Sequence, residues 1–396
     1  MNIRNKLSIG KYRIIAALGT AVGAPVVSIL IAAAAPDAVQ YMSEAAKYTP
    51  VPVVSDNSDF SNGSLILYKP SAQPVPAASG PETENVPDEP KDEQAALLIR
   101  NISQVQEDLT AFSDISGEIG EKTFTPNGGP DFITLPSGGQ VRNCTDLSNE
   151  TVANEAKKPC GIIPELYSEE PQVLIIHTHT SESYEPSEKA YYDDDYTCRS
   201  EDPDNSVVAV GAAMAEELAS AGIAVLHDGT IHDAQYTGAY DRSLATTEKL
   251  LDEFPSIKII LDVHRDAIEE QDGTRISAVT KINGEKAAQI MIISAADDGN
   301  YNMPHYLENF HFACAFQQAI ESRYPTLTRP VLFQYCQYNQ QLSTGSLLIE
   351  VGSHGNSVEQ AVYSGRLVGR ALASMFTETD SGFHSTMPRF FLDKLR

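Results

Sequence analysis

The prediction of the fold starts from one stretch, Val173-Leu174-Ile175-Ile176-His177-Thr178-His179-Thr180-Ser181-Glu182-Ser183-Tyr184. Four consecutive aliphatic residues predict a short strand that is buried on both faces, because an exposed face would require alternating polar residues. The polar residues then lie at the carboxyl end of that strand, the edge of an open α/β sheet where catalytic groups collect. Imidazole and carboxylate groups at this edge suit a zinc ion, although they also fit ordinary polar capping of a strand.

The length, charge and cysteine content narrow the class of protein. The chain has 396 residues, enough for one large domain with extensions or two modest domains. Its formal net charge is -26, with 54 acidic and 28 basic residues, which argues against a nucleic-acid partner because such binding needs a basic face. The five cysteines contain no CxxC pair, so a thiolate zinc site is not expected and disulfide pairing stays open.

Residues 1–36 have the composition of a membrane segment. Four basic residues within residues 1–13 precede an uncharged run over 14–35. An apolar run of about twenty residues spans a bilayer, and the basic flank keeps the amino end in the cytoplasm, so the rest of the chain is expected outside the membrane. We interpret the run as a signal anchor, with cleavage before Pro36 as the alternative.

Composition and periodicity divide the rest of the chain. Residues 37–91 are rich in Pro, Ser and acidic residues, which predicts a disordered spacer. Residues 92–165 predict a helix over 92–112 followed by an irregular region punctuated by Gly and Pro. A folded domain is expected over 166–378, and 379–396 form a carboxyl-terminal tail.

Strands and helices alternate within the expected domain. This alternation predicts an α/β fold with a mostly parallel sheet covered by helices on both faces. Asn283-Gly284 predicts a hairpin turn between strands at 275–282 and 287–295. The other strands are expected at 173–176, 223–226, 257–263, 331–338 and 346–351, and the helices at 206–221, 241–254, 306–323 and 357–376.

Three predicted strands end in reactive side chains. His177 and His179 follow the first strand, His264 follows residues 257–263, and Glu350 follows residues 347–349. The carboxyl ends of parallel strands share one edge, so these groups are expected to converge. Any one of them alone is weak evidence, but their joint occurrence predicts metal catalysis.

These motifs together resemble the stage II sporulation protein P family. The resemblance implies a zinc-dependent peptidoglycan amidase, related in fold to the N-acetylmuramoyl-L-alanine amidases, that acts on the septal wall during spore engulfment. It also implies cleavage of stem cross-links, a site of action in the intermembrane septal space, and a membrane complex with stage II sporulation proteins D and M. The matching segments are 136–143, 177–184, 227–233, 240–243, 261–266 and 349–356.

The resemblance also implies metal ligands. His264 and His179 match the two metal-binding histidines of the amidases, and His177 is either a further ligand or a support for one. The amidase pattern places a glutamate at the start of the following helix, where this chain has Asn205-Ser206. Glu182 is therefore expected to replace it, with Glu201 in reserve.

Glu350 matches the catalytic glutamate of the amidases. In the implied mechanism, zinc polarises the amide carbonyl and activates water, while Glu350 takes the water proton and passes it to the departing amine. Stabilising the oxyanion requires a further donor, for which Arg265 is the first candidate and Arg242 and His354 are others. His227 and His232 are interpreted as hydrogen-bonding loop residues.

Three other functions remain as alternatives. A metal-dependent esterase or carboxypeptidase on another envelope polymer would use the same ligands. An inactive envelope scaffold would not need Glu350. A serine hydrolase is suggested by Ser181 and Ser353, but the chain has no G-x-S-x-G motif.

Overall fold

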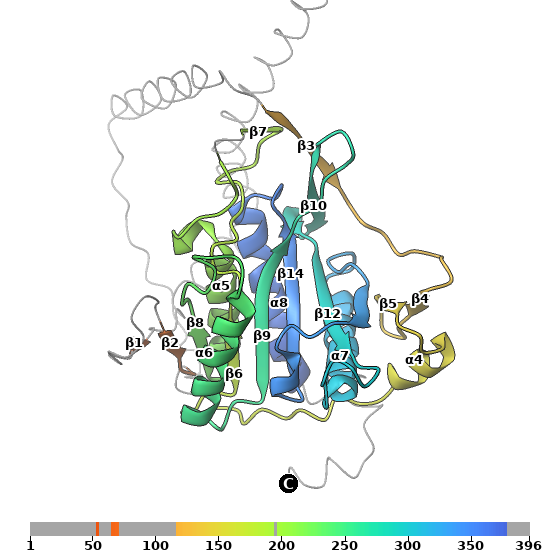
Figure 1. Ribbon diagram of the computed structural model, residues 1–396, viewed down its shortest axis with the longest axis vertical. Coiled ribbons are helices and arrows are strands. Elements are labelled where there is room, and N and C mark those ends of the chain that lie inside the picture. Colours follow the sequence, from red (N-terminus) through yellow and green to blue (C-terminus); the bar gives the residue numbers. More distant parts are fainter. Residues whose placement is uncertain (1–52, 55–64, 71–115, 194–195, 378–396) are drawn as a thin grey trace, which may run out of the picture. The chain divides into compact units, whose positions relative to one another are not determined.

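The structure is a computed structural model, and it describes residues 53–54, 65–70, 116–193 and 196–377. These residues form a mixed α/β fold built on a ten-stranded sheet, together with a four-stranded sheet (Figure 1). The order in the large sheet is β1 (Val53–Val54), β2 (Leu65–Tyr68), β8 (Val225–Asp228), β6 (Val173–Ile176), β9 (Ile259–Asp266), β14 (Ser346–Ser353), β12 (Ile290–Ala296), β13 (Val331–Tyr335), β5 (Gln140–Cys144) and β4 (Phe132–Thr134).

Strand β6 is buried on both faces, as its aliphatic sequence predicts. Val173 and Ile175 belong to the larger hydrophobic core, whereas Leu174 and Ile176 belong to the smaller one. All four residues are at most 2% exposed. Because successive side chains of a strand point to opposite faces, the two cores lie on the two sides of the sheet.

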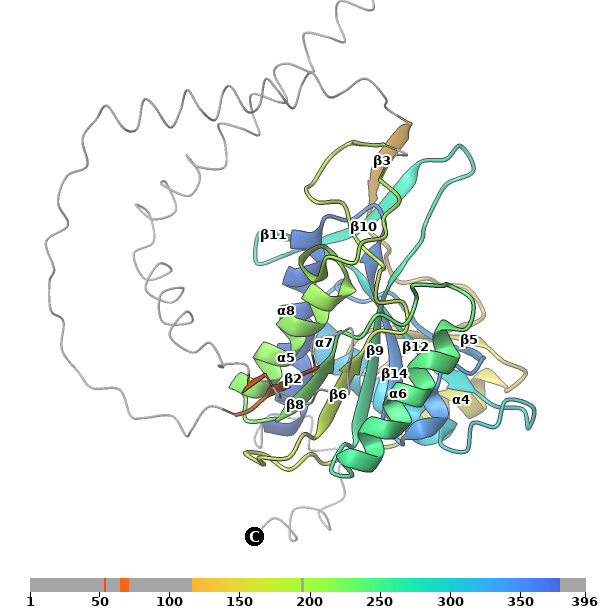
Figure 2. The same ribbon diagram turned by 60° about the vertical axis from the view of Figure 1, so that its left-hand side comes forward.

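Helices cover both faces, as predicted, but unequally (Figure 2). On one face, α6 (Ala239–Glu253) packs Leu250 against Leu174 and its neighbours in the smaller core. Ser206 caps the amino end of α5 by accepting the Val208 N–H, and Gly222 follows its end with a φ of 93°. The opposite, larger core contains α5 (Val207–Ser220), α7 (Tyr306–Arg323) and α8 (Val358–Thr377).

The large sheet is more mixed than the expected, mostly parallel one. Strands β8, β6, β9 and β14 run parallel, but β12 pairs antiparallel with β14. No helix connects β9 to β12, so the chain does not cross back to the starting edge of the sheet. It re-enters at the edge where β9 ends, and it must therefore run in the opposite direction.

The segment between β9 and β12 forms the hairpin predicted from Asn283-Gly284. Both turn residues have positive φ, 52° and 90°, as the favoured two-residue turn requires. The single strand expected at 287–295 is wrong, because the chain breaks at Gln289, whose buried side chain bonds the backbone of Phe124 and Thr326. The smaller sheet has the order β11 (Glu285–Ala288), β10 (Arg275–Ile282), β3 (Gly117–Lys122) and β7 (Tyr191–Tyr192).

The structure changes the expected domain boundaries. Residues 65–68, inside the expected spacer, form β2 and pair antiparallel with β8, with Leu65 and Tyr68 buried. Strands β4 and β5 also belong to the large sheet, so the folded unit begins before residue 166. All five cysteines lie in the described residues, and none forms a disulfide.

Other predictions about the ends of the chain fall outside the described residues. They are the membrane segment over 1–36, the helix over 92–112 and the tail over 379–396. Among the helices that the structure does describe, none combines the length and the apolar character needed to cross a bilayer.

Candidate metal and catalytic site

The candidate site lies where the neighbouring strands β6, β9 and β14 end. His264 on β9 and Glu350 on β14 are direct partners in the parallel register, so their side chains lie on the same face. Alternation along β9 places His264 on the side of Ile260, which packs in the core under α6. His179 and Glu182 come from the loop after β6. The structure therefore brings four of the predicted site residues to one edge of the sheet.

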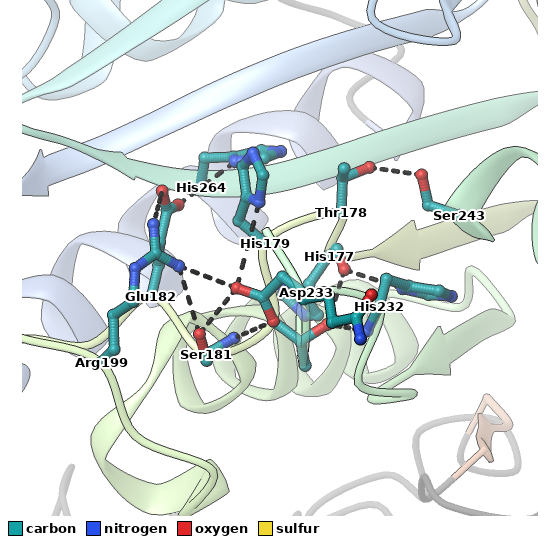
Figure 3. Close-up of polar contacts among 12 residues, drawn as sticks. His177, Thr178, His179, Ser181, Glu182, Arg199, His232, Asp233, Ser243 and His264 are labelled. Atoms are coloured by element: carbon teal, nitrogen blue, oxygen red, sulfur yellow. Dashed lines mark hydrogen bonds and ion pairs between the residues drawn. The ribbon is translucent and has the colours of Figure 1, made fainter. Parts of the chain in front are cut away.

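The loop after β6 is fixed so that Glu182 faces β9. The Glu182 N–H donates to the His179 carbonyl at 2.9 Å, and the Glu182 carbonyl accepts from Val207, the first residue of α5, at 2.9 Å. The carboxylate Oε2 accepts the Arg265 N–H at 3.2 Å and lies 3.2 Å from His264 Nδ1 (Figure 3). Helix α5 and strand β9 thus position this carboxylate from both ends.

A second pair of carboxylates lies beside the two imidazoles. Asp262 Oδ1 is 2.9 Å from His264 Nε2, and Asp262 itself accepts bonds from Thr178 N and Oγ1. Asp233 Oδ2 lies 4.0 Å from His179 Nδ1. Histidines that bind metals usually have a carboxylate on the nitrogen that does not face the ion, which fixes the orientation of the ring. Asp262 occupies such a position beside His264, whereas Asp233 is too far from His179 for a hydrogen bond, and its Oδ2 accepts from Ser181 Oγ and Arg199 Nη1.

Burial and neighbouring charges act in opposite directions on this cluster. Burial favours a lower pKa for His264, but the carboxylates of Asp262 and Glu182 raise its pKa well above the ordinary value. Burial favours a higher pKa for Glu182, but the His264 hydrogen bond and charge lower it overall. Burial raises the pKa of Glu350 to about 8. Because its Oε2 has no partner among the described residues, Glu350 is suited to accept and release a proton.

The donor set of His179, Glu182 and His264 suits zinc in its chemistry. Two donors on one tetrahedral zinc lie roughly 3.3 Å apart when each bond is about 2.0–2.1 Å long, close to the 3.2 Å between His264 Nδ1 and Glu182 Oε2. The His179 and His264 rings meet edge to face, with centroids 5.4 Å apart. Among the side chains that the structure describes, no three His, Cys, Asp or Glu groups already surround one point as ligands do. Metal binding is therefore a proposal based on the donor set.

A family model covers most of the chain. The model described as stage II sporulation protein P matches residues 61–373, a range that contains every residue of the candidate site. This chain belongs to the stage II sporulation protein P family. The resemblance seen in the motifs is therefore confirmed at the level of the family.

The individual proteins that resemble this chain share less than a third of its residues over the aligned regions. The stage II sporulation protein P of Bacillus subtilis (strain 168) is 27% identical over 218 residues, which cover 52% of this chain and 50% of that protein. The chain thus spans about half the length of this curated relative. An N-acetylmuramoyl-L-alanine amidase from Clostridium difficile 630 aligns with 17% identity and a TM-score of 0.30, over 52% of this chain and 96% of the amidase. An amidase from Mycobacterium smegmatis gives 11% identity and a TM-score of 0.31, over 53% and 98%.

The structure does not bring His177 to the candidate site. Alternation along β6 places it on the face of Ile175, under α5 rather than α6. Its Nδ1 lies 2.9 Å from the Val263 carbonyl and its Nε2 lies 2.9 Å from Nε2 of His227. Both ring nitrogens are therefore occupied, and the expectation that His177 is a ligand is wrong for this structure. Glu201, the reserve carboxylate, is exposed.

The side chains predicted to stabilise the oxyanion also bind other groups in this structure. Arg265 points away from His264, and its guanidinium donates to the carbonyls of Ser183, Asp266 and Cys198. Its expected catalytic role is therefore not supported. Arg242 likewise donates to three loop carbonyls, and His354 Nε2 contacts Glu269. His232 bonds the His177 carbonyl and Thr246, which agrees with its interpretation as a hydrogen-bonding loop residue.

Sequence reasoning missed an aromatic wall beside the histidines. Tyr236 stacks on His179 with ring centroids 4.6 Å apart and is 65% exposed. Tyr240 meets His179 edge to face at 5.6 Å and lies 5.3 Å from Tyr338. Tyr338 and its neighbour Asn339 have φ values of 49° and 55°, a conformation that non-glycine residues rarely adopt. The sequence signal that could have predicted this wall is the position of Tyr236 and Tyr240 shortly after His232-Asp233.

Proposed function

We propose that this protein is a zinc-dependent peptidoglycan hydrolase that cleaves the amide between N-acetylmuramic acid and L-alanine. One observation carries the proposal, the placement of His179, Glu182 and His264 around one strand edge with Glu350 beside them. Membership of the stage II sporulation protein P family supports it. Zinc held by the three ligands would polarise the amide carbonyl and lower the pKa of water.

The chain's own residues supply the proton transfers. Glu350 lies next to His264 across the strand pair, with an unpartnered buried Oε2. A single carboxylate there takes a proton from the attacking water and gives it to the departing amine. Asp262 would orient the His264 imidazole, and the exposed ring of Tyr236 forms one wall of the approach to His179.

The cellular setting belongs to the same proposal. Family membership supports degradation of septal wall during spore engulfment, with the hydrolase held to the membrane by residues 1–36 and facing the space outside it. Cleavage of stem cross-links and assembly with stage II sporulation proteins D and M complete the proposal.

The test is a digest of purified wall by the full chain, with the products identified by mass spectrometry. An amidase releases peptides with a free alanine amino end and leaves intact glycan, whereas an esterase or carboxypeptidase leaves that amide whole. Chelation of the metal is expected to stop cleavage, and added zinc to restore it. Cleavage that continues unchanged after complete metal removal would contradict the proposal.

Glu350→Gln separates chemistry from metal binding. The substitution keeps the size of the side chain but removes the proton acceptor, so turnover is expected to fall about 10²- to 10⁴-fold. Bound zinc, measured by elemental analysis, is expected to stay at the wild-type level. A variant that retains wild-type turnover would rule out Glu350 as the proton carrier.

A further inference from the structure

One cation near the site is buried and only partly paired. The Arg329 side chain is 9% exposed, and its Nη1 donates to Asp266 Oδ2 at 2.8 Å. Its Nε and Nη2 are buried, with no hydrogen-bond partner among the described residues. The guanidinium carbon lies 5.7 Å from the centroid of the Phe124 ring. Buried arginine donors are normally satisfied, so an unpaired edge calls for an explanation.

The topology places this edge at the candidate site. Asp266 follows His264 by two residues on β9, so its side chain lies on the same face. Strand β13 runs antiparallel to β14, and Arg329 lies two residues before its start, at the edge where β14 ends. The Arg329 N–H bonds Ile290, the first residue of β12, at 2.7 Å. Arg329 and Asp266 are also among the charges that act on Glu350.

The free edge has the geometry of a carboxylate receptor. Nε–H and Nη2–H point in parallel from one side of a planar guanidinium, and this pair matches the two oxygens of a carboxylate. Asp266 holds the remaining side through Nη1, so the plane is fixed before a ligand arrives. A second cation, including a metal ion, would be repelled at this position.

We propose that Arg329 is a substrate-binding residue whose Nε–Nη2 edge receives a carboxylate of the wall peptide beside Glu350. This inference rests on the proposed function and names the substrate group that the site selects. It suggests how a chain with net charge -26 holds an anionic polymer, since two donors of a buried guanidinium remain for it beside the Asp266 ion pair. Arg329 would align the peptide so that the scissile amide lies next to Glu350.

The experiment compares two substrates on the full chain. One is a muramoyl tripeptide with free carboxylates, and the other is the same compound with those groups converted to carboxamides. The wild type is expected to favour the free form about 10- to 100-fold in KM, the range for hydrogen bonds to charged groups. Arg329→Gln should remove this preference, and Arg329→Lys should retain only part of it because an ammonium lacks the paired donors.

Controls separate the outcomes. Arg366→Gln changes an arginine that pairs with Glu216 between α5 and α8, and it should keep the wild-type preference. Zinc content and melting temperature should match wild type in every variant used. Calorimetric binding of the uncleavable tripeptide, free or amidated, measures the same preference without turnover. An Arg329→Gln variant that keeps the preference, or that slows both substrates equally, overturns the carboxylate assignment. Failure of the wild type to cleave either substrate counts against the proposed function alone.

Discussion

Two pairs of buried histidines lie on opposite faces of the large sheet. On the α6 face, the rings of His179 and His264 meet with centroids 5.4 Å apart. On the α5 face, His177 and His227 meet with centroids 5.2 Å apart and their Nε2 atoms at 2.9 Å. All four residues are at most 7% exposed. Residue type, burial and ring spacing are therefore nearly the same in the two pairs.

The two pairs differ most at His264, since burial lowers the pKa of His179 as it lowers the pKa values of His177 and His227. The carboxylates of Asp262 and Glu182 surround His264 and raise its pKa well above the ordinary value, even though burial opposes this. Around His177, burial dominates and lowers its pKa to about 4, and the pKa of His227 also falls well below the ordinary value. Carboxylates attract a cation, whereas a neutral pair that bonds to itself serves packing. The acids beside His264 therefore distinguish the candidate metal site from the packed pair, whereas the histidines alone do not.

The strongest test of this difference between the two pairs is to remove one histidine from each pair. His264→Ala is expected to abolish both bound zinc and muropeptide cleavage, because a proposed ligand is lost. His177→Ala is expected to keep zinc and lose about 1–3 kcal/mol of unfolding free energy, because His227 loses its buried partner. Elemental analysis and denaturant unfolding measure the two effects. His311→Ala, whose side chain pairs with Glu155 away from the site, is the matched control. Loss of zinc from the His177 variant would erase the distinction between the faces.

Much of the architecture could be predicted because local signals were strong. Three sequence features each had one dominant physical interpretation: the aliphatic run of β6, the Ser206 cap of α5 and the Asn283-Gly284 turn. The convergence of His264 and Glu350 followed from parallel pairing. The direction of β12 could not be predicted, because it depends on the absence of a crossover helix and not on the strand's own sequence.

The face of the sheet on which each site residue lies was harder to predict. Alternation along β6 places His177 on the face opposite His264 only if the exact end of β6 is known, and the boundaries of an element are the least certain part of its prediction. Arg265 directly follows His264 on β9, and for that reason it must point to the other face. Arg329 is distant in sequence from every motif, so only the folded chain places it near Glu350. Such residues require tertiary information.

The carboxylate neighbours offer a finer test of the comparison. Asp262→Asn removes the charge beside His264 Nε2 while keeping an acceptor for the Thr178 N–H. Replacing an outer partner of a metal-binding histidine typically costs about 10- to 100-fold in metal affinity, and a zinc competition assay would measure this loss. Asp228→Asn, which changes a buried aspartate bonded to Thr230, is the matched control and should leave affinity unchanged. Equal affinities in the two variants would show that Asp262 does not support the site.

The smallest expected effect tests the packing role of the α5 face. A Cβ at Gly211 on α5 would lie 2.7 Å from the Nε2 atoms of both His177 and His227. The His177 ring cannot easily move away from this Cβ, because its Nδ1 also contacts the Val263 carbonyl. Gly211→Ala should therefore lower the unfolding free energy by about 1–3 kcal/mol, despite the better helix propensity of alanine. Gly128→Ala, where a Cβ meets nothing within 4 Å, is the control in thermal unfolding. Zinc should stay bound in the Gly211 variant, because the crowded imidazoles are not its ligands. A variant of unchanged stability that has lost zinc would instead place the His177–His227 pair within the metal site.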